Sequence, residues 1–318
     1  MRTVKSIAVN LLTLLAVAAG LLLAAVGYSD RLPPQTHPLV ACAGMAMPAA
    51  LALDVAMLLV MLAVRWKRAW IPLAACAATY APIRNFLPLH FTDGDAEGPE
   101  TLRVMTYNVC GYGGNSKYEH GLDTVTAYVM AHRLDVVCTQ EEHCKKFDTV
   151  GKWKKLYPYN DTTVVGAGKA EYANTMGIHT RLPIVKKETI DYESGTNGSV
   201  AYFLLWGGDT VVVVNNHLES THLTARERTD YQEILKGNKE PEEAEMKMDS
   251  IISKLAESMV KRAPEAQAVH KYVEEHRKRH PVVVCGDFND TPISYTRRTV
   301  AQGLTDCFAK SGRGIGLS

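Results

Sequence analysis

The chain has 318 residues and a formal net charge of +1, and 47% of its residues are hydrophobic. This length exceeds one minimal domain and allows a membrane region together with a catalytic domain of roughly 200 residues. The near-neutral charge provides no basic surface of the kind that duplex-binding proteins carry. It therefore disfavours a dedicated duplex nuclease, but it neither proposes nor excludes a phosphate-bearing substrate.

The first predicted element is a transmembrane helix. No residue from Ser6 to Tyr28 is charged, and Arg2 and Lys5 precede this stretch. At about 1.5 Å per residue the segment is long enough to cross a hydrocarbon core of roughly 30 Å. A cleaved signal peptide is the alternative, because residues 25–27 resemble a small-residue cleavage site. The apolar run is longer than a typical signal core, however, and a second run follows at once.

Two further apolar segments follow. Residues 38–64 form the second predicted span and contain one charge, Asp54. An acid inside a bilayer is a functional candidate by default, although one charge is thin support for a transporter. We expect Asp54 to face a neighbouring helix, or the span to be shifted so that Asp54 lies nearer an interface. Residues 69–83 are short for a span, and Arg84 follows. This third segment either crosses with Arg84 reaching the interface, or is re-entrant or interfacial.

The basic residues of the loop at 65–68, with Arg2 and Lys5, belong on the cytoplasmic side by the positive-inside rule. Three crossings would then place the rest of the chain outside the cytoplasm, whereas two would leave it inside. We expect a multi-pass protein of bacterial inner-membrane type whose catalytic domain is extracytoplasmic.

The acidic, glycine- and proline-containing stretch at 92–100 is typical of a linker. We therefore expect a membrane region at 1–91 with two to three transmembrane helices and a catalytic domain at 101–318. Seven cysteines show no metal-ligand spacing, and most should be small core residues. Their odd number argues against a complete disulfide framework, although one bridge involving Cys110 or Cys144 stays open in an oxidising compartment.

The soluble part alternates predicted strands and helices. Hydrophobic segments with strand composition lie at 102–109, 134–138, 176–184, 201–206, 210–215 and 282–285. Apolar residues at helical spacing predict helices at 122–133, 248–259 and 264–279. We expect the last two helices to cover a sheet, with 236–245 as a polar connector.

The strand at 282–285 leads into Gly286 and Asp287-Phe288-Asn289. Side chains two apart on an extended segment point to the same side, so Asp287 and Asn289 should share a cleft while Phe288 turns into the core. A carboxylate that orients water, beside an amide that donates hydrogen bonds, suits phosphate chemistry. An ordinary turn is the alternative, because Gly-Asp and Asn-Asp-Thr-Pro are common loop sequences.

Other polar groups also follow predicted strands. Glu141 comes at the end of a buried strand, where an unpaired carboxylate is costly and Mg²⁺ is a natural partner. For Glu142 we expect the first turn of a helix, where the macrodipole favours an acid. Asn108 alone is more typical of a turn. His217 is either structural or suited to bind a phosphate oxygen.

In combination, four sequence pieces resemble the endonuclease/exonuclease/phosphatase superfamily, the deoxyribonuclease I-like fold. They are residues 105–109, 140–141, 216–218 and 286–292, and the resemblance covers residue 101 onward. It implies an α/β fold, a four-layer sandwich of two mixed β-sheets flanked by helices, here preceded by transmembrane helices. It also implies a nuclease, phosphodiesterase or phosphatase that uses Mg²⁺ (or Mn²⁺). Membrane-tethered members are a familiar arrangement.

The resemblance also implies residue roles. Glu141 is the principal metal ligand and Asn108 supports the metal. His217 binds the scissile phosphate, Asp287 orients the attacking water, and Asn289 holds both water and phosphate. The expected partners are a phosphate-ester substrate (lipid, nucleic acid or small molecule) and the membrane, with no obligate protein partner evident.

One departure from the family pattern concerns the end of the chain. The family closes with an Asp-His pair on a last strand, whereas residues 311–316 look like the loop that leads towards such a strand. Asp306 lacks an adjoining histidine and is not given that role. The sequence therefore resembles a member without its last strands, and the alternative function is a catalytically impaired phosphate-binding or scaffold protein.

Overall fold

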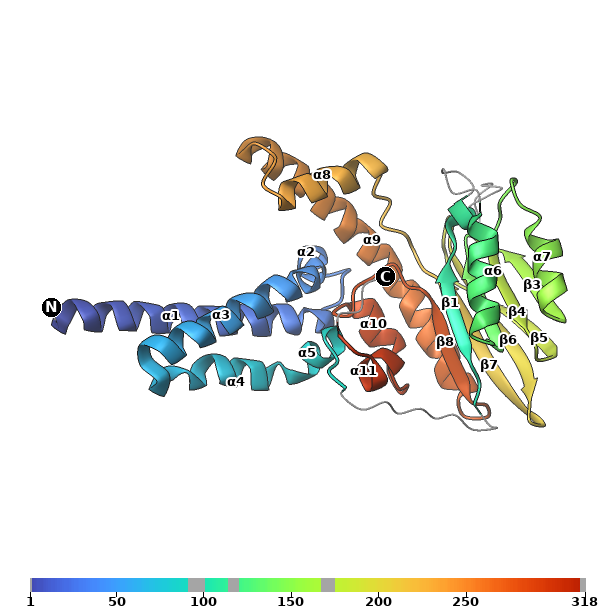
Figure 1. The fold of residues 1–318 in the computed structure, drawn as a ribbon, viewed down its shortest axis with the longest axis horizontal. Helices are drawn as coiled ribbons and strands as arrows, with labels where there is room; N and C mark the ends of the chain where they lie inside the picture. Colours follow the sequence, from blue (N-terminus) through green and yellow to red (C-terminus); the bar gives the residue numbers. More distant parts are fainter. Residues whose placement is uncertain (1, 91–100, 114–119, 167–174, 315–318) are drawn as a thin grey trace. The chain divides into compact units, whose positions relative to one another are not determined.

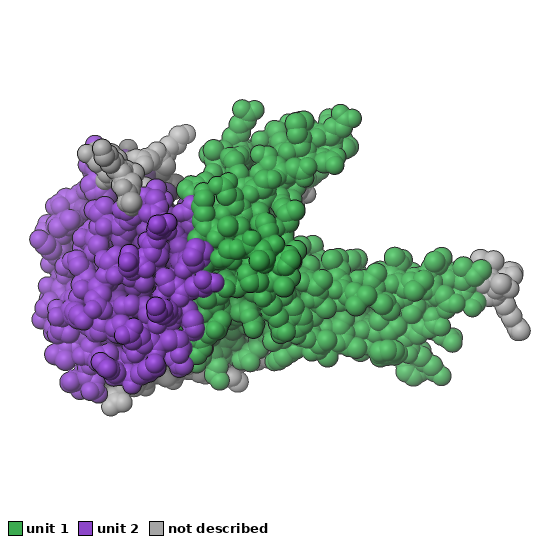
Figure 2. All heavy atoms as spheres, turned by 180° about the vertical axis from the view of Figure 1, so that it is seen from behind, with its two compact units in different colours: residues 1–94, 221–263, 290–318 green, residues 95–220, 264–289 purple. Residues whose placement is uncertain are grey.

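The computed structural model describes the chain except residues 1, 91–100, 114–119, 167–174 and 315–318 (Figure 1). The chain divides into two compact units (Figure 2). We call residues 1–94, 221–263 and 290–318 the helical unit, and residues 95–220 and 264–289 the sheet unit. The predicted linker at 92–100 lies outside the described residues. The predicted domain boundaries at 1–91 and 101–318 stay a prediction. Each unit is a group of residues that lie close in space, and it combines segments that are far apart in the sequence.

The sheet unit contains two mixed four-stranded sheets. The first has the order β1-β2-β4-β3, with β1 (Val104–Asn108), β2 (Val136–Gln140), β3 (Tyr159–Val164) and β4 (Thr175–Thr180). The second has the order β5-β6-β7-β8, with β5 (Ile184–Ile190), β6 (Gly198–Trp206), β7 (Asp209–His217) and β8 (Val282–Asp287). In each sheet one pair is parallel, β1 with β2 and β7 with β8, and the remaining pairs are antiparallel.

A continuous apolar core lies between the two sheets. Val136 and Ile178 of the first sheet pack in one cluster with Tyr202 and Val213 of the second, and all four are fully buried. The runs of β-branched residues in β7 and β8 favour strands because they pack well on a pleated surface. The β6–β7 hairpin turns at Gly207 and Gly208, both with positive φ, which glycine adopts without steric cost.

Helices cover the outer faces of both sheets. α6 (Gly121–Ala131) and α7 (Thr149–Leu156) share a buried cluster with Val137 of β2. On the other sheet, Tyr272 of α9 (Pro241–His276) donates a hydrogen bond to Glu188 of β5, and the rings of Phe203 and His276 are 5.7 Å apart. The order helix, sheet, sheet, helix confirms the predicted four-layer α/β sandwich (Figure 1).

The helical prediction for residues 236–279 is partly wrong. We expected two helices with a connector, but α9 runs unbroken from Pro241 to His276 with Pro264 inside it. A proline removes one backbone hydrogen bond from a helix. The buried side of α9 nevertheless continues past Pro264, since Ala263, Ala266 and Val269 are all fully buried. Packing on both sides of the proline outweighs the lost bond.

The first part of α9 also does not cover a sheet, as we expected it to. Its buried side chains Ile251, Leu255 and Met259 pack on Ala41 and Cys42, within the helical unit. Apolar residues at helical spacing show that one side of a helix is buried, but they do not identify the element against which it packs.

The helical unit contains the two predicted spans. Its first helices are α1 (Arg2–Gly27), α2 (Pro38–Ala41), α3 (Met47–Arg65), α4 (Trp70–Ala78) and α5 (Tyr80–Phe86), with short 3₁₀ turns at Ser29–Arg31, Cys42–Ala46 and Trp66–Arg68. α8 (Ala225–Leu235), the first part of α9 (residues 241–263), α10 (Tyr295–Val300) and α11 (Cys307–Ser311) complete it. Among the described residues, Ser6–Arg31 and Pro38–Arg68 are long and apolar enough to cross a membrane.

Only 22% of the apolar window in each of these stretches is buried, which is not the pattern of a helix in a soluble core. Leu14, Leu21 and Leu59 are each more than 60% exposed. Asp54 is fully buried and accepts from the Cys76 thiol of α4, so it does face a neighbouring helix. The third apolar segment is broken into α4 and α5 at Thr79.

Candidate active site

The predicted site residues lie at the same ends of neighbouring strands. Asn108 ends β1 and Glu141 follows β2, whereas His217 and Asp287 end β7 and β8. Asn289 comes two residues after β8. Because β1 pairs with β2 in parallel, and β7 with β8, each pair delivers its carboxyl ends to one edge of its sheet. The two edges meet, because Asn108 at the end of β1 donates a hydrogen bond to Asp287 at the end of β8.

One amide connects the carboxylates of the two sheets. Asn108 Nδ2 donates to Glu141 Oε1 at 2.9 Å and to Asp287 Oδ2, also at 2.9 Å. His217 Nε2 lies 3.7 Å from the same Glu141 oxygen. These four side chains, which are far apart in the sequence, therefore form one polar cluster.

Asn289 is attached to this cluster through its backbone. Its N–H donates to Asp287 Oδ1 at 2.9 Å and so fixes the carboxylate. Its side-chain amide donates to the carbonyl oxygen of Leu218 at 2.9 Å rather than to the other site residues. Phe288, which we expected in the core, is only half-buried, because β8 is the edge strand of its sheet and has β7 as its one neighbour.

The backbone at the site is unusual at three positions. Glu141 and Asn289 have φ values of 53° and 51°, a left-handed conformation that costs a residue with a Cβ about 1–2 kcal/mol. Such strain concentrates at functional sites. Gly286 has a φ of 136°, and a Cβ there would lie 2.1 Å from the carbonyl oxygen of Asn216. Only glycine allows β8 to approach β7 this closely beside Asp287.

The cluster combines two carboxylates with one amide and one imidazole. Burial lowers the pKa of His217, although the nearby carboxylates of Asp287 and Glu141 act in the opposite direction. The imidazole is therefore neutral at pH 7, and it leaves two carboxylates facing one amide. The ring's Nδ1 is buried and has no hydrogen-bond partner among the residues that the structure describes.

This donor set fits a hard divalent cation. Mg²⁺ prefers carboxylate and amide oxygens and keeps several waters, so one or two protein carboxylates suffice. Glu141 and Asp287 offer carboxylate oxygens at one point. Asn108 turns its NH2 group towards them, and its Oδ1 accepts from the Cys110 N–H at 3.0 Å. Within the described part of the chain, no three His, Cys, Asp or Glu side chains are grouped to hold an ion. Water or substrate oxygens would therefore complete the coordination.

Sequence reasoning missed the residues that hold the two sheets together beside the site. Gln140 Nε2 donates to Asn215 Oδ1 at 2.6 Å. Asn215 Nδ2 donates in turn to the carbonyl oxygens of Thr139 and Gly177, each at 3.1 Å. Gln140 and Asn215 are fully buried. The available signal was two successive asparagines that end a run of valines, where a core residue would be expected.

Glu142 does not begin a helix, so that prediction was wrong. It is 1% exposed, and its Oε1 lies 3.0 Å from His179 Nε2 in β4. The His179 ring stacks on Trp153 with centroids 4.0 Å apart, and Thr139 donates to the other carboxylate oxygen at 3.2 Å. A buried partner was available across the sheet, and it outweighed any local preference for a helix start.

Replacing Glu142 by alanine should destabilise the protein. Removing the Glu142 carboxyl leaves the buried His179 ring nitrogen and the Thr139 hydroxyl without this partner, and an unsatisfied buried polar group typically costs about 1–3 kcal/mol of unfolding free energy. The expected result is a clearly lower midpoint of thermal unfolding for the full chain in detergent. Glu193→Ala removes an exposed carboxylate and should leave the midpoint unchanged. Equal midpoints for the two variants would show that the pair with His179 contributes little.

The fold and the cluster define an α/β sandwich with a polar site where two sheet edges meet. The chain belongs to the Endonuclease/Exonuclease/phosphatase family, whose model matches residues 105–312. Residues 9–86 match a second family, described as a domain of unknown function (DUF8431). No match was found among curated proteins.

Several solved structures are similar to this chain. Sphingomyelinase C from Streptomyces griseocarneus is 21% identical, with a TM-score of 0.44, over 63% of this chain and 68% of that one. The human nocturnin catalytic domain with bound sulfate is 17% identical, with a TM-score of 0.43 and the same coverage. TDP2 of D. rerio in complex with a single-strand DNA product is 15% identical, with a TM-score of 0.41, over 65% and 66% of the two chains. The match thus spans slightly less than two thirds of that TDP2 chain.

Proposed function

We propose that this protein is a membrane-anchored hydrolase of phosphate esters that depends on Mg²⁺ or Mn²⁺. The observation that carries the proposal is the cluster of Asn108, Glu141, His217 and Asp287, in which carboxylates from two sheets converge on one amide. Two carboxylates that accept from the same NH2 group lie close enough to repel each other, and a bound cation would relieve that repulsion.

Each residue has a role that its position supports. Glu141, with Asn108, would hold the cation, which when bound supplies positive charge to neutralise the phosphate. His217 would donate from Nε2 to a phosphate oxygen, since Nε2 faces the cluster and Nδ1 is buried. Asp287 would orient the attacking water, and its carboxylate is already held by the Asn289 N–H. The amide oxygen of Asn289 is left to accept from that water.

We also infer that α1 and α3 anchor the enzyme as membrane spans. The Arg68 guanidinium donates to Asn10 Oδ1 at 3.0 Å and to Thr13 Oγ1 at 2.7 Å, so the basic loop lies beside the first half of α1. At the other end, the Tyr28 hydroxyl donates to the Ala78 carbonyl. The segment through α4 therefore returns to the end of α1. This supports a third crossing and an extracytoplasmic catalytic domain, as in a bacterial inner-membrane protein.

Hydrolysis of a chromogenic phosphodiester, bis(p-nitrophenyl) phosphate, tests the function. We expect the full chain to cleave it with Mg²⁺ or Mn²⁺, and EDTA to reduce the rate at least about tenfold, with recovery when excess metal is added. The activity should remain in the membrane pellet after an alkaline wash. Folded protein that binds phosphate without turnover would contradict the enzyme and support the phosphate-binding alternative.

A further inference from the structure

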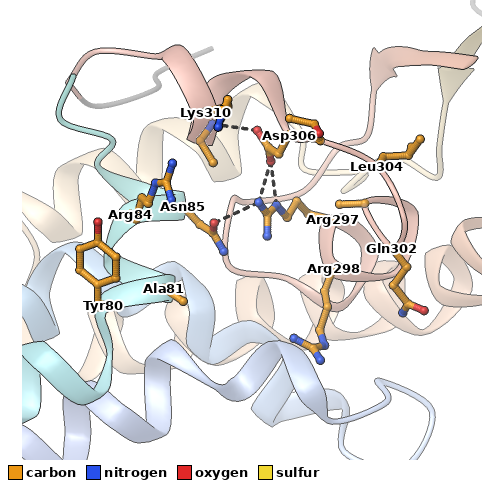
Figure 3. A pocket seen from close by; sticks show the side chains of 13 residues that line it. Tyr80, Ala81, Arg84, Asn85, Arg297, Arg298, Gln302, Leu304, Asp306 and Lys310 are labelled. Atoms are coloured by element: carbon orange, nitrogen blue, oxygen red, sulfur yellow. Dashed lines mark hydrogen bonds and ion pairs between the residues drawn. The ribbon is translucent and has the colours of Figure 1, made fainter. Parts of the chain in front are cut away.

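A second polar site lies in the helical unit, apart from the residues of the proposed active site. It is a cavity of about 450 Å³ lined by α5, α10 and α11 and the turn between the last two (Figure 3). This volume is within the range of about 300–1,000 Å³ that is typical of ligand pockets. The charged side chains that line it are Arg84, Arg297, Arg298, Lys310 and Asp306.

Positive charge exceeds negative charge in this pocket. Arg297 donates to Asp306 Oδ2 from Nε at 2.9 Å and from Nη2 at 2.7 Å, and also to Asn85 Oδ1 at 3.1 Å (Figure 3). Burial alone would raise the pKa of Asp306, but the Ala309 N–H and Arg297 hold it below its ordinary value. Asp306 is therefore ionised at neutral pH and already committed to Arg297.

The other positively charged side chains of the pocket form weaker ion pairs than Arg297 does, or none with the described residues. Arg298 is 4.0 Å from the nearest oxygen of Asp30, and its side chain is 47% exposed. Arg84 is half-buried and makes no hydrogen bond or ion pair with any residue in the described parts of the chain. Lys310 is exposed at the rim. A half-buried guanidinium without a carboxylate is well matched by a phosphoryl group, whose oxygens accept its parallel N–H donors.

The pocket lies at the end of the apolar helices that is opposite the basic loop at 65–68. Gly27 of α1 packs against Pro82 of α5, where an added Cβ would be 3.1 Å from the Pro82 Cβ. Tyr80, a residue of the pocket lining, is 64% exposed. An amphipathic aromatic at the end of an apolar helix is typical of the membrane–water interface.

We propose that this pocket binds the phosphoryl headgroup of an anionic phospholipid from the leaflet at this end of the helices. The inference rests on the membrane insertion proposed above, but not on hydrolysis. Leu21 and Leu22 of α1 are 67% and 46% exposed and lie within two turns of Gly27, which packs on α5. They provide an apolar surface for acyl chains, which a free phosphate would not use. Arg84, Arg298 and Lys310 contact the headgroup, while the Arg297–Asp306 pair holds α10 and α11 together around it.

Thermal unfolding of the full chain in detergent tests the site. Adding phosphatidylglycerol should raise the midpoint by several degrees more than the same mole fraction of phosphatidylcholine, because a ligand that binds only the native state stabilises it. The double variant Arg84→Gln/Lys310→Gln should lose at least half of this difference. Lys271→Gln/Lys278→Gln removes the same charge from exposed positions on α9 and in the turn that follows it, and this variant should retain the difference.

The control ligands separate the possible sources of phosphate. Glycerol 3-phosphate and inorganic phosphate should leave the midpoint nearly unchanged, and an equal shift with either one would overturn the lipid assignment. An undiminished phosphatidylglycerol effect in the pocket variant would overturn the site itself. If the double variant already melts lower in phosphatidylcholine, Arg298→Gln decides, because that side chain is largely exposed and should still reduce the difference.

Discussion

Replacing Asp287 by asparagine should lower kcat/KM for a phosphodiester by about a thousandfold, within the range of about 10²–10⁴ for a positioned acid–base group. The substitution keeps an oxygen to accept from the Asn289 N–H, which now bonds Asp287 Oδ1. It removes the charge that we propose orients the attacking water, and its new NH2 group meets the Asn108 NH2, which now donates to Asp287 Oδ2. Turnover should therefore fall far more than stability, and steady-state kinetics beside a thermal melt would show both.

Asp287→Ala should reduce kcat/KM at least as much, with an added loss of stability because the Asn289 N–H also loses its acceptor. Asp209→Asn is the matched control, since Asp209 is an exposed carboxylate at the start of β7. It should behave as wild type. Turnover that persists unchanged in Asp287→Asn would remove the proposed role of this residue.

Replacing Glu141 by glutamine should raise the Mg²⁺ concentration needed for half-maximal activity about a hundredfold. The amide has the same shape and keeps one oxygen, but it loses the negative charge that a hard cation prefers. The rate at saturating Mg²⁺ should recover in part, because Asp287 and His217 remain in place. A titration of initial rate against Mg²⁺ concentration measures the change.

Glu193→Gln removes an exposed carboxylate of the sheet unit and serves as the control for that titration. Its Mg²⁺ dependence should match wild type. If Glu141→Gln instead lowered the rate equally at every Mg²⁺ concentration, Glu141 would act on substrate or water rather than on the cation.

The sequence placed the candidate residues at strand ends, and that position is what brings them together, although their roles stay a prediction. A hydrophobic run that stops at a polar residue identifies both a buried strand and the group that the strand presents. This reasoning placed Asn108, Glu141, His217 and Asp287 at strand ends, and their side chains do meet. The same runs predicted two mixed sheets by resemblance, and the structure confirms them.

Features that depend on a contact with a residue far away in the sequence could not be predicted from strand ends. β3 escaped prediction because an edge strand with alternating exposure has a polar sequence, including Asp161 and two threonines. Glu142 is set by His179, 37 positions further along the chain in a neighbouring strand. The side-chain direction of Asn289 depends on the Leu218 carbonyl. In each case the deciding contact is long-range, whereas the sequence pattern is local.

The buried hydrogen bond from Gln140 to Asn215 connects the two sheets, and this determines how the candidate site can be disrupted. Glu141 comes directly after Gln140, and His217 is two residues beyond Asn215, so each half of the cluster is carried by its own sheet. Any defect that lets one sheet rotate against the other separates the two halves without altering a single cluster residue. The rate of the proposed hydrolysis should therefore report the alignment of the two sheets, and it should decline before unfolding can be detected.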